Sequence, residues 1–495
     1  MVAQKNLCVL ILAAGKGTRM KSSLPKPLHR VCGLPMIAHS LRAAQSLHPG
    51  AICVVVGHEA QRVMDEIKAN LTAWGITAPI VFAEQKELNG SAGAVRAALP
   101  LLDKFQSVMV LNGDAPMIRP ETLQQMYDAF DTNEAGALVL GVTVPEPKGY
   151  GRIVREEDGR FARIVEEADA DDQTRQINEV NGGMYVFNAK ALISALSLLK
   201  PQGPKQEYYL TDTLAHIKDF QDVVLVFNLA DYQQALGVNC QADLAKAEDI
   251  MRARIAHKLM DSGVRLVRPY EVYIDEDVQI GADTTVCPGC YLKGKTQIGE
   301  NCRLDGSVFI TDSVIGNNVF LKLGTYIEEG CVIEDGCEVG PYAHLRPGTV
   351  LKKGAKVGNF CEIKKSVIGE GSKVNHLTYI GDTDMGQGVN IGAGTITCNY
   401  DGQKKHRTVI GDHCFVGSNV NFVAPVEIKP YSKIGAGSTI TKDVPEEPLA
   451  VARARQVVLE NKGGQKNDQN RKRGFPQFLH QLQPDPGAEN SGAPE

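Results

Sequence analysis

The chain contains 495 residues, of which 43% are hydrophobic and 22% charged, and its formal net charge at pH 7 is -5. This length exceeds what a single hydrophobic core usually serves, so we expect two or more domains. The small net charge provides no general attraction for nucleic acids or anionic membranes, and we expect neither as a partner.

Cysteine usage and hydropathy both predict a cytoplasmic protein. The twelve cysteines are spread along the chain without a compact framework, which is typical of reduced thiols. One close pair, Cys287 and Cys290, lacks a second pair at zinc-site spacing, so we interpret both as small interior residues. The apolar run at residues 7–14 is short and leads into Gly-Lys-Gly instead of a cleavage site, and no other run predicts a transmembrane helix.

The N-terminal half alternates short β-branched runs with helical patterns. That alternation predicts a mainly parallel sheet covered by helices, which binds ligands at the carboxyl ends of its strands. The predicted strands are residues 7–14, 51–57, 80–84, 107–114, 136–144, 151–156 and 183–188. The predicted helices include residues 36–47, 60–74, 120–130 and 189–199.

The first predicted strand runs into a loop with two glycines and two cations, in the stretch LAAGKGTRM at residues 12–20. This stretch is not a dinucleotide-binding fingerprint, because Met20 stands where the third glycine belongs. It is not a P-loop either, because a P-loop needs four residues between its glycine and Gly-Lys. Such a loop can still hold phosphate through backbone amides and cations. Arg19 and Lys26 can be surface cations or phosphate ligands, and their place after a buried strand favours phosphate binding.

A linking helix is predicted between two domains, because residues 243–261 combine good helix formers with no internal Gly or Pro. We predict a first domain at residues 1–241, the linking helix at 242–262 and a second domain at 263–462. Residues 463–495 are rich in Gly, Gln, Asn, Lys and Pro, which predicts a disordered tail.

Beyond residue 270 an aliphatic or aromatic residue recurs every six positions, often followed by glycine. A period of six over this length predicts a parallel β-helix whose aliphatic side chains point inward. The register slips between Ile363 and Ile410, where we expect loops that can grip a ligand. The repeating positions are Ile280, Val286, Leu292, Ile298, Leu304, Ile315, Leu321, Ile327, Ile333, Val339, Leu345, Leu351, Val357, Ile363, Ile410, Val416, Phe422, Ile428, Ile434 and Ile440.

Motifs in the two halves resemble two kinds of transferase. The N-terminal half resembles sugar-nucleotide pyrophosphorylases through LAAGKGTRM, LPKPLH, NGDAPMI, GYGRIV, EVNGG and GVN. The C-terminal half resembles hexapeptide-repeat acyltransferases, through HLRPGT, VGNFCEIKK, NHLTYIGD and NIGAGTITCNYDG. In this order, across nearly residues 1–455, they resemble the bacterial bifunctional N-acetylglucosamine-1-phosphate uridylyltransferases and glucosamine-1-phosphate N-acetyltransferases.

This resemblance implies an α/β chain: a Rossmann-like nucleotidyltransferase domain, the linking helix and a left-handed parallel β-helix. It also implies a homotrimer with acetyl-transfer sites between neighbouring β-helices. The implied substrates are glucosamine-1-phosphate, acetyl-CoA and UTP, and the product, UDP-N-acetylglucosamine, supplies peptidoglycan and lipopolysaccharide synthesis.

The implied uridylyl transfer joins a sugar-1-phosphate oxygen to the α-phosphorus of UTP and expels pyrophosphate. Because the nucleophile is already an anion, the enzyme must position the reactants and neutralise charge rather than supply a base. By resemblance, Arg19 and Lys26 neutralise the triphosphate, while Gln85 lies in the uracil-binding stretch. The implied contacts are Leu12, Ala13, Ala14, Gly15, Arg19, Lys26, Gln85, Gly90, Ser91, Asn112, Gly113, Asp114, Gly151, Glu166, Asn181 and Asn239.

In this half of the chain, two positions depart from the family pattern and one assignment is ambiguous. Gly93 stands where the family often has histidine, and Asn112 replaces an aromatic residue. Glu166, implied to accept from sugar hydroxyls, adjoins Glu167, so a one-residue shift would exchange them.

Asp114 follows a predicted strand, where a carboxylate can hold Mg²⁺ against phosphates. An aspartate at such a position is otherwise a common turn former. The resemblance adds Asn239 as a second ligand, and we expect Mg²⁺ as the cofactor.

The implied acetyl transfer moves an acetyl group from acetyl-CoA to the amine of glucosamine-1-phosphate. An ammonium cannot attack a thioester, so a base is needed, and histidine suits that role near neutral pH. We predict His376 as this base, with a covalent route through Cys398 as the alternative. The implied sugar-phosphate contacts are Arg346, Lys364, Tyr379, Asn390 and Lys405, and the implied acetyl-CoA contacts are Ala393, Asn399, Tyr400, Ser418, Ala436 and Arg453.

Two other functions compete with this hypothesis. One is a single-activity nucleotidyltransferase whose β-helix regulates or oligomerises, and the other is a non-catalytic assembly protein with the same two folds. His376 and Tyr400 in their loops argue against the first, and Arg19, Lys26 and Asp114 argue against the second.

Overall fold

The computed structural model describes residues 4–202, 206–220 and 222–458. The described residues up to Val451 belong to one compact unit. The predicted disordered tail at 463–495 lies outside the described residues. Among the described residues, no helix combines the length and apolar character needed to cross a membrane.

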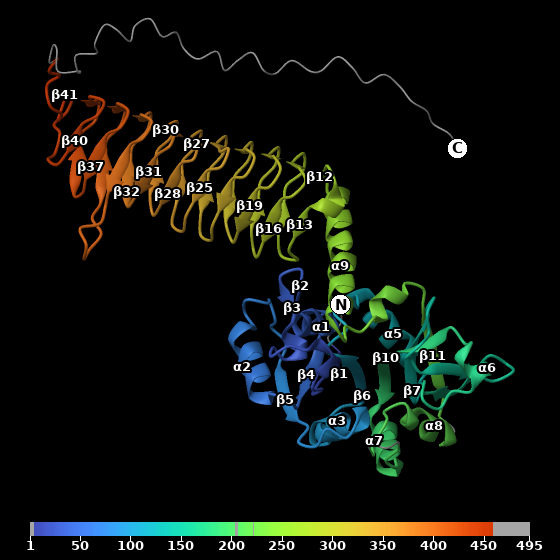
Figure 1. Cartoon of the computed structure of the whole chain (residues 1–495). Coiled ribbons are helices and arrows are strands. Elements are labelled where there is room, and N and C mark those ends of the chain that lie inside the picture. Colours follow the sequence, from blue (N-terminus) through green and yellow to red (C-terminus); the bar gives the residue numbers. More distant parts are fainter. Residues whose placement is uncertain (1–3, 203–205, 221, 459–495) are drawn as a thin grey trace, which may run out of the picture. The chain divides into compact units, whose positions relative to one another are not determined.

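The N-terminal region is built on a mixed, mostly parallel sheet, as predicted (Figure 1). Its main path runs β11-β7-β10-β6-β1-β4-β5, with β10 antiparallel to both neighbours and the other pairs parallel. A hairpin of β8 and β9 joins through β10. The strands are β1 (Gln4–Ala13), β4 (Pro49–Val56), β5 (Ile80–Glu84), β6 (Ser107–Asn112), β7 (Ala137–Thr143), β8 (Arg152–Arg155), β9 (Phe161–Val165), β10 (Glu179–Asn188) and β11 (Val224–Leu229).

Helices cover both faces of this sheet because its strands alternate between two apolar cores. On β1, Leu7, Val9 and Ile11 point into one core, and Cys8 and Leu10 into the other. The first core is closed by α1 (Met36–Gln45), α2 (Ala60–Asn70) and α5 (Pro120–Thr132). The second is closed by α3 (Ser91–Ala97), α4 (Leu99–Leu102), α7 (Ala189–Leu198) and α8 (Asp212–Asp219).

All seven predicted strands and four predicted helices of this half are confirmed, but shorter elements were missed. Strands β9 and β11 lack strong alternation of buried residues, and α3 and α8 are too short to show a helical period. The remaining short elements are α6 (Asp172–Arg175), η1 (Thr18–Met20), η2 (Lys26–Leu28), η3 (Tyr232–Ala235), and the hairpin of β2 (Arg30–Val31) and β3 (Leu34–Pro35).

The segment predicted as the linking helix is a helix, α9 (Gln241–Asp261). It begins with a capping box, in which Asp243 at the third helical position accepts from the backbone of the N-cap residue Cys240. It ends at Asp261, with Ser262 as its C-cap, and is followed by Gly263, whose φ of +93° suits glycine.

The C-terminal region is the predicted left-handed parallel β-helix, with three parallel sheets running along it (Figure 1). The first sheet contains β12 (Arg265–Leu266), β15 (Thr285–Val286), β18 (Arg303–Leu304), β21 (Phe320–Leu321), β24 (Glu338–Val339), β27 (Lys356–Asn359), β30 (Lys373–His376), β33 (Asn390–Ile391), β36 (Phe415–Val416), β39 (Lys433–Ile434) and β41 (Leu449–Ala450). The second contains β13 (Tyr273–Ile274), β16 (Tyr291–Lys293), β19 (Phe309–Thr311), β22 (Tyr326–Ile327), β25 (His344–Leu345), β28 (Glu362–Lys364), β31 (Tyr379–Gly381), β34 (Ile396–Cys398), β37 (Asn421–Val423) and β40 (Thr439–Ile440). The third contains β14 (Gln279–Ile280), β17 (Gln297–Ile298), β20 (Val314–Ile315), β23 (Val332–Ile333), β26 (Val350–Leu351), β29 (Val367–Ile368), β32 (Thr383–Met385), β35 (Thr408–Ile410) and β38 (Val426–Ile428). The short helix η4 (Pro269–Glu271) lies between β12 and β13.

The repeating aliphatic side chains form the core of this solenoid, and every predicted repeat position is buried. The register slip beyond Ile363 is confirmed, but the expected interruption is much shorter than we inferred. Some successive core positions here are five residues apart instead of six, which shifts the register in the sequence. The coils themselves continue, with buried core residues at Ile368, Val374, Ile380, Met385 and Ile391. The long loop is confined to residues 399–407, between β34 and β35.

Cysteines fill small interior places in this core, as we inferred for Cys290. That thiol is buried, whereas Cys287 is half-buried, and burial raises the pKa of Cys290 to about 11. Other buried solenoid cysteines are Cys302, Cys331, Cys337, Cys361 and Cys414.

Candidate active sites

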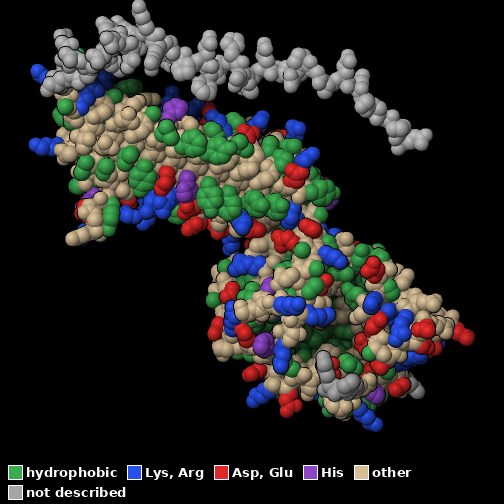
Figure 2. Space-filling view, in the orientation of Figure 1, with side chains coloured by type: hydrophobic (Ala, Val, Ile, Leu, Met, Phe, Trp, Pro, Cys, Tyr) green, Lys and Arg blue, Asp and Glu red, His purple; other side chains and the backbone are tan. Residues whose placement is uncertain are grey.

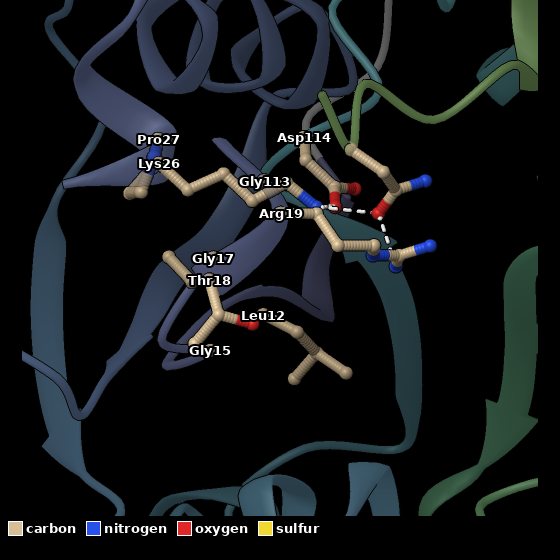
Figure 3. A pocket seen from close by; sticks show the side chains of 11 residues that line it. Leu12, Gly15, Gly17, Thr18, Arg19, Lys26, Pro27, Gly113 and Asp114 are labelled. Atoms are coloured by element: carbon tan, nitrogen blue, oxygen red, sulfur yellow. Dashed lines mark hydrogen bonds and ion pairs between the residues drawn. The ribbon is translucent and has the colours of Figure 1, made fainter. Parts of the chain in front are cut away.

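The glycine loop after β1 forms one wall of a cavity of about 240 Å³ (Figure 3). Gly17 has a φ of +60°, and a Cβ there would lie 2.7 Å from the Cβ of Lys26, so glycine lets the loop close against η2. The carboxyl end of β6 supplies the opposite wall. The lining residues are Leu12, Ala13, Gly15, Gly17, Thr18, Arg19, Lys26, Pro27, Gly113, Asp114 and Asn239.

Four predicted polar side chains converge in this cavity from three separate parts of the chain. The Lys26 ammonium forms an ion pair with Asp114 and donates to Asn239 Oδ1 at 2.8 Å. Arg19 Nη2 donates to the same Asn239 oxygen at 2.9 Å (Figure 3). Cations and oxygen ligands thus meet where the carboxyl ends of β1 and β6 face the start of α9.

The pair Asp114 and Asn239 suits a divalent cation. Both present oxygen atoms to one ammonium, so the two oxygens face a point that already holds positive charge. Mg²⁺ prefers oxygen ligands and is commonly held by one or two protein groups together with substrate phosphates. The described part of the chain contains no cluster of three or more His, Cys, Asp or Glu side chains placed to hold a metal.

A larger cavity of about 1000 Å³ shares Leu12, Arg19, Asp114 and Asn239 with the first. Asn181 lies in its wall with fixed geometry, since its Nδ2 donates to Tyr185 Oη at 2.7 Å and its Oδ1 accepts from the Gly183 N–H at 2.9 Å. Asn112 also lines it and donates to the Gly183 carbonyl at 3.1 Å.

Glu166 and Glu167 have different partners, which bears on the ambiguity between them. Glu167 accepts from the buried Arg152 at 2.8 Å and from the Gly149 N–H at 3.0 Å, and these bonds lower the pKa of its carboxyl. Glu166 accepts from the Thr211 hydroxyl at 3.0 Å. Gly151 lies against Glu166, because a Cβ at Gly151 would lie 3.2 Å from its Oε2. Glu167 is thus engaged in holding the local loop.

The predicted uracil-binding residues lie together but line neither cavity. Gln85 is buried, and its Nε2 donates to Asn89 Oδ1 at 3.3 Å and to the Gly90 carbonyl at 3.1 Å. Ser91 Oγ accepts from the Leu210 N–H at 3.0 Å. A Cβ at Gly93 would lie 1.8 Å from Asn89 Oδ1, so Asn89 occupies the space that a side chain at 93 would need.

The sequence did not identify several residues of the larger cavity. Tyr150, Lys148, Asp243 and Lys246 all line it. Burial, followed by the charge of Asp243, raises the pKa of Tyr150. Their positions gave the only signal in the sequence. Tyr150 lies within the GYGRIV motif, Lys148 directly precedes it, and Asp243 and Lys246 lie in the first two turns of the linking helix.

In the solenoid, His376 ends β30 with an exposed side chain. Its Nδ1 lies 3.1 Å from Oδ1 of Asn359, which pairs with it across β27 and β30. An amide oxygen accepts, so this contact favours a proton on Nδ1 and leaves Nε2 as the basic nitrogen. Asn359 was not predicted, because its role depends on a neighbour one coil away.

Predicted sugar-phosphate residues line up on neighbouring coils. Arg346 donates to Glu362 Oε1 at 2.9 Å, and this bond raises the pKa of the guanidinium. Lys364 lies beside Lys405 of the 399–407 loop, whose contact and charge lower the pKa of Lys364. Two cations therefore approach each other at the base of this loop.

Tyr379 and Asn399 contact each other above Gly381. Asn399 Nδ2 donates to Tyr379 Oη at 3.4 Å and to Asp382 Oδ2 at 2.6 Å. A Cβ at Gly381 would lie 2.4 Å from Tyr379 Oη, so glycine is required for this arrangement.

Three predicted acetyl-CoA positions occupy the same corner of successive coils. Ala393, Ser418 and Ala436 each follow an aliphatic-glycine pair, at Ile391, Val416 and Ile434. Asn390 starts β33 beside this corner, and Tyr400, the second residue of the 399–407 loop, has an exposed side chain. Arg453 lies beyond the compact unit.

The comparisons with known proteins match both regions. The nucleotidyl transferase family model matches residues 8–234, and the bacterial transferase hexapeptide (six repeats) model matches residues 330–365 and 407–442. Among solved structures, UDP-glucose pyrophosphorylase complexed with UDP-glucose matches with a TM-score of 0.43 and 20% identity, over 51% of this chain and 100% of that chain.

Curated relatives match over nearly the full chain. The bifunctional protein GlmU of Geotalea uraniireducens (strain Rf4) is 46% identical over 456 residues, covering 92% of this chain and 98% of that protein. Those of Heliobacterium modesticaldum and Syntrophomonas wolfei subsp. wolfei are 45% and 44% identical, each over 92% of this chain and 98% and 100% of their own lengths. This coverage selects the bifunctional enzyme over the single-activity and non-catalytic hypotheses. The chain belongs to the family of bifunctional GlmU proteins.

Proposed function

We propose that this chain makes UDP-N-acetylglucosamine in two steps, each at its own site. It first acetylates glucosamine-1-phosphate with acetyl-CoA and then transfers a uridylyl group from UTP to the product, releasing pyrophosphate. The product supplies cell-wall precursor synthesis. We assign the uridylyl step to residues 1–241, the acetyl step to 263–462, and the connection to 242–262.

The observation that carries the uridylyl assignment is the meeting of Arg19, Lys26, Asp114 and Asn239 around one cavity. Arg19 and Lys26 neutralise the triphosphate as the sugar phosphate oxygen bonds to the α-phosphorus and the bond to pyrophosphate breaks. Mg²⁺ held by Asp114 and Asn239 would supply further charge neutralisation when bound. Glu166, Gly151 and Asn181 hold the sugar in the adjoining cavity.

For acetyl transfer, we assign the base to His376. Its Nε2 takes a proton from the substrate ammonium, and the amine bonds to the thioester carbonyl carbon. As the carbon–sulfur bond breaks, the nitrogen of the new amide gives up its second proton, which the departing thiolate takes, and the imidazolium releases the first proton to solvent. Arg346, Lys364 and Lys405 hold the sugar phosphate, and the small residues at the Ala393 corner give acetyl-CoA room to lie along the solenoid.

The chain should act as a homotrimer. Support comes from exposed apolar residues on the solenoid, where Figure 2 displays hydrophobic side chains in patches. Tyr273, Tyr291, Phe309 and Tyr326 stack on successive coils, with ring centroids 4.4, 6.0 and 4.7 Å apart. Sedimentation analysis should give three times the 53.6 kDa chain mass. A monomer would contradict this assignment.

An omission experiment tests both reactions. The pure protein is incubated with glucosamine-1-phosphate, acetyl-CoA, UTP and Mg²⁺, each omitted in turn, and products are identified by mass spectrometry. Without acetyl-CoA we expect no UDP-N-acetylglucosamine, and without UTP we expect N-acetylglucosamine-1-phosphate alone. A Cys398→Ala variant should retain acetyl transfer, whereas its loss would support the covalent route.

A further inference from the structure

The linking helix begins two residues after Asn239, a proposed metal ligand. Asp243, in its first turn, accepts at Oδ2 from the backbone N–H of Asn239 at 2.9 Å and of Cys240 at 3.1 Å. The second bond closes an ordinary capping box. The first reaches one residue further back and holds the backbone that carries the Asn239 amide.

The short segment before the helix is also bonded to the opposite wall of the cavity. The Val238 N–H donates to the carbonyl of Asp114 at 2.9 Å. Asn239 therefore has one neighbour fixed to the Asp114 backbone and its own N–H fixed to Asp243. With both sides held, its Oδ1 faces Lys26 and Arg19.

A second anchor lies three turns along the same helix. Arg254 Nη1 donates to the carbonyl of Met117 at 2.6 Å, in the loop that Asp114 begins. Arg254 also lies 3.4 Å from Asp231, and its guanidinium is mostly withdrawn from solvent. Helix α9 thus contacts both chain segments that supply the proposed metal ligands.

Packing makes this helix a firm support. Met20, Met117 and Val238, which lie next to or near Arg19, Asp114 and Asn239, share one buried cluster with α9 residues Ala247, Met251 and Ile255. The cluster continues into the solenoid core. Displacing α9 would therefore disturb well-packed side chains as well as hydrogen bonds.

We propose that Asp243 is a positioning residue for uridylyl transfer, which sets Asn239 opposite Asp114, with Arg254 as a second anchor on the Asp114 loop. This proposal rests on the uridylyl assignment above. Groups that orient metal ligands in this way commonly affect metal affinity or activity by 10–100-fold when removed.

The test compares Asp243→Ala with Asp243→Glu, because a glutamate at this helical position can still close the capping box. Asp261→Ala, an exposed acid in the last turn of α9, is the matched control. Mn²⁺ binding in the presence of UDP-N-acetylglucosamine is measured by electron paramagnetic resonance, alongside the Mg²⁺ dependence of uridylyl transfer. Acetyl transfer by each variant reports the integrity of the rest of the chain.

We expect Asp243→Ala to weaken Mn²⁺ binding and raise the Mg²⁺ concentration for half-maximal rate by about 10-fold, with acetyl transfer unchanged. Asp243→Glu should recover most of the loss, and Asp261→Ala should match the native chain. Arg254→Met should shift both quantities in the same direction by a smaller factor, and it provides the test if Asp243→Ala does not fold.

Native Mn²⁺ affinity and Mg²⁺ dependence in Asp243→Ala would overturn the proposal, even with a lowered melting temperature. A change confined to KM for N-acetylglucosamine-1-phosphate would also overturn it, because Asp243 would then contact the sugar directly in the cavity it lines. Failure of the uridylyl assignment is separate: in that case the native protein itself would form no UDP-sugar.

Discussion

The lysines of the two proposed sites have different partners. In the N-terminal cavity, Lys26 is paired with Asp114 and bonded to Asn239, so its charge is held before substrate arrives. In the solenoid, Lys364 lies beside Lys405, and the side-chain contact with Lys405, followed by burial and by the charge of Lys405, lowers the pKa of Lys364. The first site is organised by its own acid and amide. In the second site Arg346 is bonded to Glu362, but Lys364 and Lys405 lie beside each other as cations that a substrate phosphate can pair with.

The sharpest way to break this comparison is to remove one group from each site. Asp114→Ala should abolish uridylyl transfer and retain acetyl transfer, because the proposed metal ligand is lost. His376→Ala should do the reverse, with a loss of about 10²–10⁴-fold expected for a general base. Separate assays with N-acetylglucosamine-1-phosphate and with glucosamine-1-phosphate check each half. Parallel loss of both activities in either variant would refute the assignment of separate sites.

A smaller effect is expected from crowding the solenoid site without removing a polar group. In Gly381→Ala, the new methyl would lie 2.4 Å from Tyr379 Oη and would displace the Tyr379 and Asn399 pair. We expect acetyl transfer to fall by about 10-fold, since small misplacements of positioning groups are costly. Uridylyl transfer by the same protein is the control and should be native. Unchanged acetyl transfer would show that this pair does not hold substrate.

The charge contrast predicts a pH dependence specific to the solenoid site. The ammonium of Lys364 loses its proton below the usual pKa of 10.5, because Lys405 is adjacent. KM for glucosamine-1-phosphate should therefore rise with pH before an isolated lysine would titrate. In Lys405→Met, KM should be higher throughout, but its alkaline rise should begin at higher pH. An unshifted rise would mean that the two lysines are not coupled in solution.

The lowered pKa of Lys364 also predicts how the stability of the fold changes with pH. A lowered pKa means that the folded chain binds fewer protons here than the unfolded chain, so stability should rise with pH between the lowered value and 10.5. The Lys405→Met variant should lose this increment in alkaline thermal unfolding. If stability rose more steeply with pH in the variant than in the native chain, Lys405 would not be the cause of the lowered pKa of Lys364.

The smallest expected effect is a difference in reactivity between cysteine thiols, which is measured without an activity assay. Burial raises the pKa of Cys290 and Cys337 to about 11, so both stay protonated and enclosed at pH 8. Cys398 is exposed at the end of β34. Alkylation followed by peptide mass spectrometry should label Cys398 well before Cys290 or Cys337. Equal labelling would mean that the solenoid opens readily.

The sequence predicted those features of the fold and the sites that depend on residues close together in the chain. The six-residue period identified the solenoid, because each buried position carries its own aliphatic residue. The continuity of the coils beyond Ile363 was missed, because a five-residue side shifts the period without breaking the stack. Likewise, Arg19, Lys26, Asp114 and Asn239 stand in local motifs, and the structure brings all four together.

Contacts between distant segments could not be found in this way. Asn359 is placed against His376 by strand pairing across one coil, and Asp243 supports Asn239 through a bond to a backbone N–H, which has no side-chain signature. The different partners of Glu166 and Glu167 depend on Thr211 and the buried Arg152, neither of which the motif contains. Such partners emerge only once the chain is folded.

Mixing the two inactive proteins tests the central claim of two independent sites most directly. Asp114→Ala and His376→Ala are combined with glucosamine-1-phosphate, acetyl-CoA, UTP and Mg²⁺, and UDP-N-acetylglucosamine is followed by mass spectrometry. Each variant alone should make none, and the mixture should make it steadily, because N-acetylglucosamine-1-phosphate released by one protein is used by the other. A mixture that releases this intermediate but forms no UDP-sugar, or forms neither product, would contradict the account.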